Sequence, residues 1–217
     1  VPATITIEGA VEGSNAEGNV EQGDILRAIT TPDGVRHEIT SAATPFAIMR
    51  SVPAGSTMTL TVERGGTTQD VSFDSVAASA TETGSKLGVY LSADPVLPVD
   101  ITVNIDGVGG PSAGMMFSLS IIDRLTPGDM TGGNVIAGTG TMSYDGQVGA
   151  IGGIQQKLWG AHRDGAQWFL APSNNCDEVV GHVPDGLRVV SVSTLDEAVS
   201  AVRSIADGTG DALPTCQ

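Results

Sequence analysis

The sequence predicts an α/β (α+β) chain in two parts: a small, mostly β domain over residues 1–80 and a mixed α/β domain over 86–207. Three observations carry this expectation. Apolar residues alternate on both sides of a Gly-Gly turn between 58 and 73, which is typical of a hairpin. Short apolar runs and amphipathic helical segments alternate after residue 86. A Ser/Thr/Ala-rich segment, 77–85, separates the two parts, and residues 208–217 form a tail.

In the first part, apolar residues at 58, 60 and 62 precede Gly65-Gly66, and two more follow at 71 and 73. This arrangement predicts two paired strands with a turn between them.

The second part is expected to begin with strands at 87–91 and 101–105, followed by a helix that starts near Ala113 and ends before Thr126. An Asp-Gly turn then joins strands 141–144 and 147–151. The remaining predicted elements are a helix over 154–164 closed by Gly165, buried strands at 168–171 and 189–192, and a last helix from the Thr194–Glu197 capping box to about 207.

A serine stands at the start of the first of these helices. Gly110 allows a tight backbone approach, and Pro111 has its φ already fixed near the helical value, so Ser112 is expected at a helix N-terminus. Free N–H groups and the helix dipole favour negative charge there, as an oxyanion requires. The alternative is that Ser112 is an ordinary helix N-cap without chemistry.

A lysine stands on the apolar side of another helix. Ile154, Leu158 and Ala161 follow helical spacing, and Lys157 lies at i+3 from the first and i−4 from the last. Apolar surroundings disfavour the charged form of a lysine, and a neutral lysine can act as a general base near pH 7. Alternatively, Lys157 buries its stem and keeps its ammonium in water.

Four motifs in order resemble the proteolytic domain of Lon-type proteases over about residues 86–205: Gly110–Gly114, Ala137–Thr141, Asp145–Ile154 and Lys157. The resemblance implies that Ser112 is the nucleophile and Lys157 the general base, with Gly110 and Ala113 supporting the serine. It also implies that Thr139 hydrogen-bonds the lysine. Many members of the family have an acidic residue where this chain has Gly109, and this difference concerns regulation.

Residues 1 to about 76 resemble most of a bacterial PDZ domain, on the strength of Ala10–Ala16, Gln22–Leu26, Val52–Gly55 and the hairpin. The resemblance implies that segment 41–51, which contains Phe46, Ile48 and Met49, is a helix that lines a peptide groove. The glycine-rich loop that binds a peptide carboxylate is not found in this stretch. A PDZ module joined to a Lon-type domain resembles extracytoplasmic bacterial proteins that are usually anchored by an N-terminal helix.

Composition excludes several classes of partner. The formal net charge of −15 argues against nucleic acid and against docking on anionic lipid. The three histidines, His37, His162 and His182, show no metal-ligand spacing, so no metal or other cofactor is expected and a Ser-His-Asp triad is the weaker interpretation. No Walker-type phosphate loop occurs in the 217 residues, so no ATP requirement is expected.

The chain contains two cysteines, Cys176 and Cys216, which are expected to form a disulfide that fastens the tail. Two unrelated thiols are the alternative. No apolar run approaches the length of a membrane span, and because the chain begins with Val1-Pro2, a signal or anchor is expected to precede it.

The combined expectation is an ATP-independent serine endopeptidase with a Ser112–Lys157 dyad that acts on polypeptides and can form a homo-oligomer. Its expected location is extracytoplasmic, with membrane attachment only through an anchor absent from these residues. The alternative is a non-catalytic scaffold that keeps the fold and holds partners through its PDZ-like half.

Overall fold

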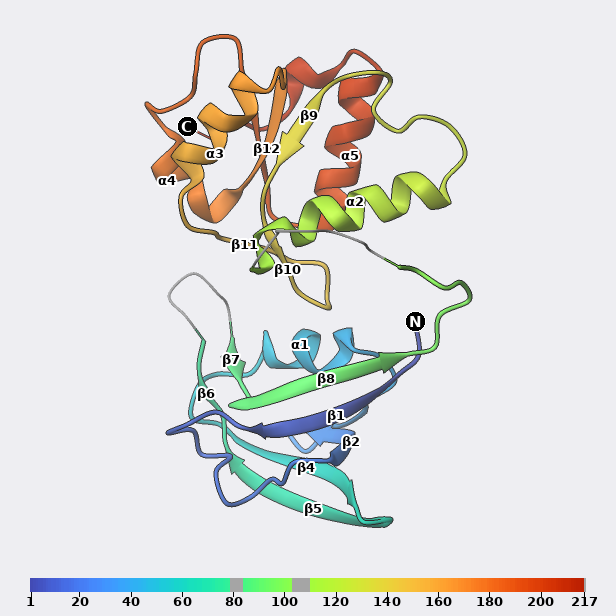
Figure 1. Cartoon of the computed structure of the whole chain (residues 1–217). Helices are drawn as coiled ribbons and strands as arrows, with labels where there is room; N and C mark the ends of the chain where they lie inside the picture. Colours follow the sequence, from blue (N-terminus) through green and yellow to red (C-terminus); the bar gives the residue numbers. More distant parts are fainter. Residues whose placement is uncertain (79–83, 103–109, 217) are drawn as a thin grey trace. The chain divides into compact units, whose positions relative to one another are not determined.

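The computed structural model describes residues 1–78, 84–102 and 110–216 (Figure 1). The chain divides into two compact units, Val1–Asn104 and Ile105–Gln217. Each unit has a hydrophobic interior of its own.

The first unit is built on an antiparallel sheet with strand order β5-β4-β2-β1-β8, and β3 pairs with β2. These strands are β1 (Ala3–Ala10), β2 (Asp24–Thr30), β3 (Arg36–Glu38), β4 (Thr57–Arg64), β5 (Thr67–Asp74) and β8 (Val89–Pro95). Helix α1 (Ala43–Met49) adds Met49 to the buried cluster of the sheet. The short strands β6 (Val76–Ala77) and β7 (Ser85–Lys86) pair with each other.

The predicted hairpin is confirmed as β4 and β5, which pair from Thr57–Asp74 to Arg64–Thr67, and the helix predicted within 41–51 is α1. The boundary between the parts differs from the expectation. The strand predicted at 87–91 and assigned to the second domain is β8, which pairs along its length with β1. The first unit therefore extends to Asn104 rather than ending near residue 80.

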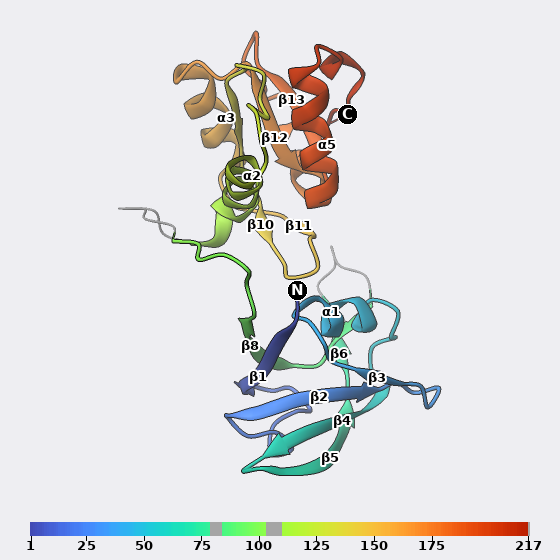
Figure 2. The ribbon, with the colours of Figure 1, turned by 90° about the vertical axis from the view of Figure 1, so that its right-hand side faces the viewer.

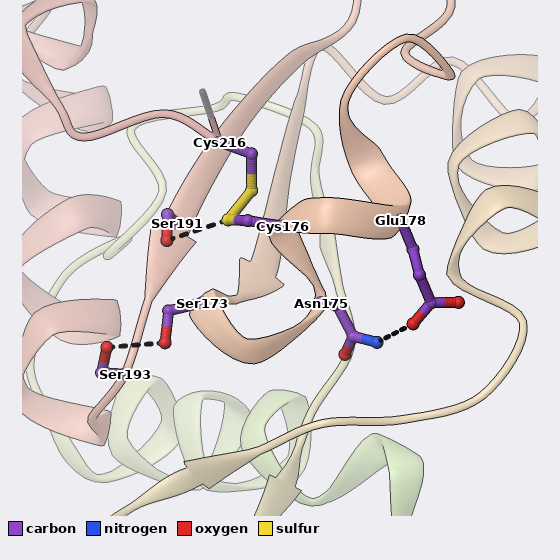
Figure 3. Close-up of a disulfide and its surroundings, with 7 residues drawn as sticks. All are labelled: Ser173, Asn175, Cys176, Glu178, Ser191, Ser193 and Cys216. Carbon is purple, nitrogen blue, oxygen red and sulfur yellow. Dashed lines mark hydrogen bonds between the residues drawn. A yellow bond between two sulfur atoms is a disulfide. The ribbon is translucent and has the colours of Figure 1, made fainter. Parts of the chain in front are cut away.

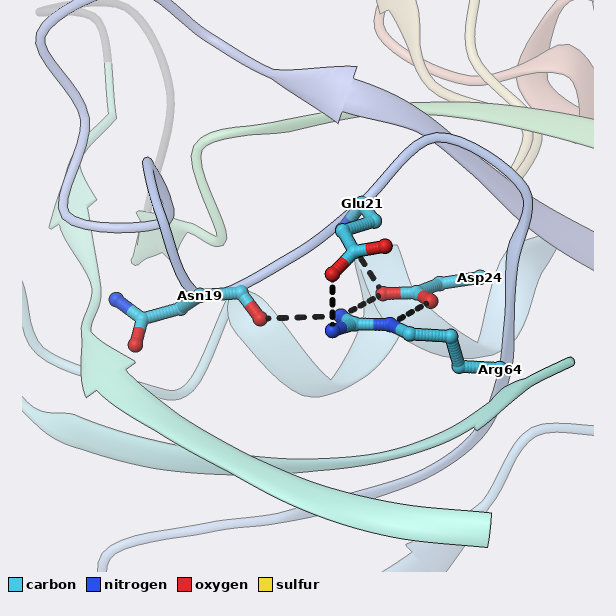
Figure 4. A network of polar contacts seen from close by, with 4 residues as sticks. All are labelled: Asn19, Glu21, Asp24 and Arg64. Atoms are coloured by element: carbon cyan, nitrogen blue, oxygen red, sulfur yellow. Dashed lines mark hydrogen bonds and ion pairs between the residues drawn. The ribbon is translucent and has the colours of Figure 1, made fainter. Parts of the chain in front are cut away.

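A buried ion pair fixes the start of β2 to the end of β4 (Figure 4). The Asp24 side chain is fully buried, and its two carboxylate oxygens accept hydrogen bonds of 2.7 Å from Nε and Nη2 of Arg64. Arg64 also donates to the Glu21 carboxylate at 2.7 Å and to the Asn19 carbonyl at 3.3 Å. The hydrogen bonds from Arg64 outweigh the effect of burial and hold the pKa of Asp24 below its usual range.

The second unit contains a parallel sheet with order β13-β12-β9, formed by β9 (Ile136–Gly138), β12 (Trp168–Pro172) and β13 (Arg188–Val192). Helix α3 (Ile154–Arg163) covers one face of this sheet and α5 (Leu195–Ala206) covers the other, as Figure 2 shows. Alternate residues of β12 enter different clusters: Trp168 and Leu170 pack with α5, whereas Phe169 packs with α3. A strand covered on both faces reads as a continuous apolar run, which is the pattern that predicted it.

The remaining elements of this unit are η1 (Pro111–Ala113), α2 (Gly114–Leu125), β10 (Thr141–Met142), β11 (Val148–Gly149), η2 (Ser173–Asn175), α4 (Cys176–Val179) and η3 (Gly210–Ala212). The predicted helices are confirmed as α2, α3 and α5, and the predicted Asp-Gly hairpin is confirmed as the shorter pair β10 and β11. Of the strand expected at 101–105, residues 101–102 belong to no strand and 103–105 lie outside the described residues.

The C-terminal segment packs along the edge of the sheet instead of forming a loose tail. Leu213 packs against the α5 cluster, and the backbone N–H of Ser191 on β13 donates to the Pro214 carbonyl at 2.9 Å. A disulfide joins Cys176 and Cys216, with the two Cα atoms 4.9 Å apart (Figure 3). Within the described residues no cysteine is left free.

Candidate active site

Ser112 lies in the single turn η1 that leads directly into α2. The turn begins at Gly110, whose φ of 85° is in the left-handed region that an L side chain rarely adopts. Pro111 occupies the first position of the turn, where its missing N–H costs nothing. Ser112 is therefore inside the turn, and the N-cap positions belong to Gly110 and Ala113.

The backbone of Ser112 is held by the segment that connects β9 to β10. Its carbonyl oxygen accepts a 2.9 Å hydrogen bond from the Thr139 hydroxyl and a 2.8 Å bond from the Gly140 N–H. In return, the Met115 N–H donates to the Gly140 carbonyl at 3.1 Å. Thr139 is buried, and its own N–H donates to the Leu170 carbonyl of β12 at 3.1 Å. The turn is thus tied to the central strand of the sheet.

Close packing at Gly114 brings α2 against β10. A Cβ at Gly114 would lie 3.1 Å from both the Cβ and the backbone nitrogen of Met142, which is tighter than most van der Waals contacts. A larger residue would therefore move the start of α2, and with it Ser112.

Lys157 lies at the end of the first turn of α3. Its neighbours Ile154 and Leu158 are fully buried, and Lys157 itself is half-buried. The helix starts after Gly153, whose φ of 71° is again left-handed, and the Lys157 N–H donates to the Gly153 carbonyl at 3.3 Å.

The two predicted residues meet: Nζ of Lys157 donates to Oγ of Ser112 at 3.4 Å. The distance is at the long end of a hydrogen bond, as catalytic contacts often are without substrate. In the turn, the Gly114 N–H is bonded to the Pro111 carbonyl, and the Met115 N–H to Gly140. The Ala113 N–H also belongs to this 3-10 turn, so the Ser112 N–H is the candidate donor to an oxyanion.

The histidines have contacts elsewhere. His162 packs edge-on against Trp159 with ring centroids 6.2 Å apart, His182 lies 3.1 Å from the Val180 carbonyl, and His37 lies 3.4 Å from the Thr31 hydroxyl in the first unit. Among the described residues, no three His, Cys, Asp or Glu side chains are grouped so that they could hold a metal ion. In the same residues no helix has the length and apolar character needed to cross a membrane.

Two further residues matter to the geometry of the site. Thr139 was expected to bond the lysine, whereas the contact that its hydroxyl makes is with the Ser112 carbonyl. Asn175, which the sequence did not single out, is buried and bonds the backbone just before α3. A polar residue after the apolar strand 168–172 was the only sequence signal for it. Gly109 lies outside the described residues.

A model of the Lon protease (S16) C-terminal proteolytic domain matches residues 48–204. Curated relatives include a Lon protease of Clostridioides difficile, 37% identical over 93 residues, which are 42% of this chain and 12% of that protein. Lon protease 2 of Herpetosiphon aurantiacus is 31% identical over 153 residues, 68% of this chain and 18% of that protein. The chain thus matches less than a fifth of the length of these relatives.

Similar solved structures include the PDZ domain of an SdrC-like protein from Listeria innocua, with 18% identity and a TM-score of 0.35. The match covers 41% of this chain and 92% of that domain. The corresponding domain from Listeria monocytogenes gives 15% identity and the same TM-score, over 40% of this chain and 85% of that domain.

Proposed function

The chain belongs to the family of the Lon protease (S16) C-terminal proteolytic domain, and on this premise we propose that it is a serine endopeptidase that hydrolyses peptide bonds with Ser112 and Lys157. The observation that carries the proposal is the contact between Lys157 Nζ and Ser112 Oγ. Serine is a weak nucleophile until a base takes its proton, and lysine is one of the few side chains that replace histidine in this role.

In the proposed reaction, Oγ of Ser112 attacks the carbonyl carbon of the scissile bond while neutral Lys157 accepts the hydroxyl proton. The Ser112 N–H, at the positive end of α2, stabilises the resulting oxyanion. Collapse of the tetrahedral intermediate breaks the C–N bond, and Lys157 returns the proton to the leaving amine. Water, deprotonated by Lys157, then hydrolyses the acyl-enzyme and regenerates Ser112.

Neither a metal nor a nucleotide has a role in this scheme. The backbone contacts that hold Ser112 come from Thr139 and Gly140, so the nucleophile is held by the fold of the second unit itself. We accordingly propose activity without ATP hydrolysis by this chain. We further propose that the substrates are polypeptides and that the protein forms a homo-oligomer. The disulfide supports an extracytoplasmic location, where thiols become oxidised.

The two lysines of the chain allow a matched test of the base. Lys157→Arg keeps a long cationic side chain but removes a group that can become neutral, and Lys86→Arg makes the same change in the first unit. We expect Lys157→Arg to lower the rate of peptide cleavage by about 10²–10⁴-fold, the usual contribution of a general base, and Lys86→Arg to leave it unchanged.

The nucleophile is tested by intact-mass analysis after exposure to a serine-directed covalent inhibitor between pH 6 and 10. A single adduct on the wild type that forms faster as pH rises, and that is absent from Ser112→Ala, supports the proposal. Ser118→Ala is the matched control, because Ser118 lies on α2 and its hydroxyl donates to the Gly114 carbonyl. No adduct on the wild type at any pH or protein concentration would favour the non-catalytic scaffold.

A further inference from the structure

We propose that Asn175 is a positioning residue that sets the location of Lys157 by fixing the backbone from which α3 starts. This inference rests on the proposed Ser112–Lys157 reaction. It concerns a residue that does not touch either reacting side chain and acts through the backbone of Ile151.

Asn175 uses every hydrogen of its amide. Its Oδ1 accepts from the Ile151 N–H at 2.9 Å, and its Nδ2 donates to the Ile151 carbonyl at 2.9 Å and to the Glu178 carboxylate at 2.7 Å. The side chain is only 2% exposed, so water does not replace these bonds readily. The amide therefore pairs with both backbone groups of one residue, as a neighbouring strand would.

The clamped residue leads directly into the lysine helix. Ile151 is followed by Gly152 and Gly153, and α3 begins at Ile154. Gly153 is in the left-handed region and Gly152 has nothing within 4 Å of a Cβ position, so this short link has little packing of its own. Fixing Ile151 consequently fixes where α3 starts, and Lys157 lies at the end of its first turn.

The element that bears Asn175 is itself braced on its other side (Figure 3). Ser173 bonds Ser193 at 2.8 Å between hydroxyl oxygens, and Cys176 is tied to Cys216 by the disulfide. The Gln155 amide also donates to the Glu178 carbonyl at 3.2 Å, which joins α3 directly to α4. Asn175 thus joins a rigid corner beside β13 to the start of the lysine helix.

An aspartate cannot replace this amide. Asp has the same size and can accept from the Ile151 N–H, but an ionised carboxylate has no hydrogen for the Ile151 carbonyl and would face the Glu178 carboxylate. Asn175→Asp therefore breaks the clamp without opening a cavity. The matched control is Asn134→Asp, because the half-buried Asn134 amide donates to the Thr131 carbonyl at 2.8 Å in the same unit.

The experiment compares wild type, Asn175→Asp, Asn134→Asp and Lys157→Ala by two readouts on the full chain. The first is the rate of labelling by a serine-directed covalent inhibitor from pH 6 to 10. The second is hydrogen–deuterium exchange of peptides that cover residues 150–158. A destabilised but correctly built site would keep the wild-type pH profile, whereas a displaced lysine would not.

We expect Asn175→Asp to slow labelling by about 10–100-fold, as a misplacement of about 1 Å does. Its residual labelling should lose the rise with pH and match Lys157→Ala, and exchange over 150–158 should increase. Asn134→Asp should behave as wild type in both readouts. Wild-type labelling rate and pH profile in Asn175→Asp would overturn the inference while leaving the Ser–Lys reaction intact.

Failure of the proposed reaction has a different signature. If the wild type is not labelled at any pH, the proposed reaction is wrong. Hydrogen–deuterium exchange is then the only test of the positioning role of Asn175. Faster exchange over 150–158 in Asn175→Asp than in Asn134→Asp then supports the clamp, and equal exchange in the two variants overturns it.

Discussion

Removal of the Cys176–Cys216 disulfide is predicted to destabilise the second unit by several kcal/mol. The bridge closes a loop with a sequence separation of 40 residues. In the chain-entropy model such a loop lowers the entropy of the unfolded chain by about 13 cal/mol/K, which corresponds to about 4 kcal/mol at 25 °C. For a unit of this size, that loss lowers the melting temperature by roughly 15–30 °C.

Tryptophan fluorescence measures this effect in the second unit alone, because both tryptophans, Trp159 and Trp168, lie there and Trp168 is buried in β12. Urea unfolding of the Cys176→Ser/Cys216→Ser variant should give a free energy of unfolding about 4 kcal/mol below that of the oxidised wild type. Wild type in reductant should coincide with the variant, and reductant should not change the variant further. A difference below about 1 kcal/mol would refute the entropic account, because the model requires the entropy of the unfolded chain to rise when this loop is opened.

Two further predictions concern the Asp24–Arg64 pair and Thr139. Arg64 holds the pKa of Asp24 below the value of about 4 that a carboxyl has in the unfolded chain. The ionised Asp24 therefore contributes its full stabilisation above about pH 4, and this stabilisation is lost as pH falls through the folded-state pKa. Asp24→Asn should remove about 2 kcal/mol at pH 7 and flatten this acid dependence in calorimetric unfolding; an unchanged slope would contradict it. Thr139→Val removes the hydroxyl bonded to the Ser112 carbonyl and should slow peptide cleavage about tenfold, an effect of about 1.4 kcal/mol, with the pH profile unchanged. A shifted pH profile would instead mean that Thr139 acts on Lys157.

The sequence predicted those elements whose signal is local. The apolar run 168–171 is a strand because both faces of β12 are covered, and the spacing around Lys157 predicted α3 nearly to the residue. The disulfide was predictable because the chain has only two cysteines. The capping box at Thr194 also holds, although Glu197 reaches back to the Ser193 N–H rather than to that of Thr194.

Pairings between distant segments escaped prediction for a physical reason. Periodicity indicates that residues 89–91 form a strand, but it does not indicate which strand pairs with them. In the structure their strand, β8, pairs with β1 from the other end of the unit. The same limit applies to Asn175. The asparagine pair 174–175 after Pro172-Ser173 is typical of a turn, and the role of Asn175 becomes visible only when Ile151 is placed beside it.

The two reacting side chains require different kinds of support from the fold. A serine has one torsion that positions Oγ, so few positions of Oγ remain once its backbone is fixed. Two hydrogen bonds to the Ser112 carbonyl fix that backbone. A lysine has four torsions. Its amine is therefore positioned only when the start of the helix, the packing of the side-chain stem and the hydrogen-bond acceptor all favour the same place. The start of α3 is fixed through Asn175, Lys157 is half-buried, and the acceptor is Ser112. Because these supports converge on one 3.4 Å contact from separate segments, the site depends on the folded unit and not on any single motif.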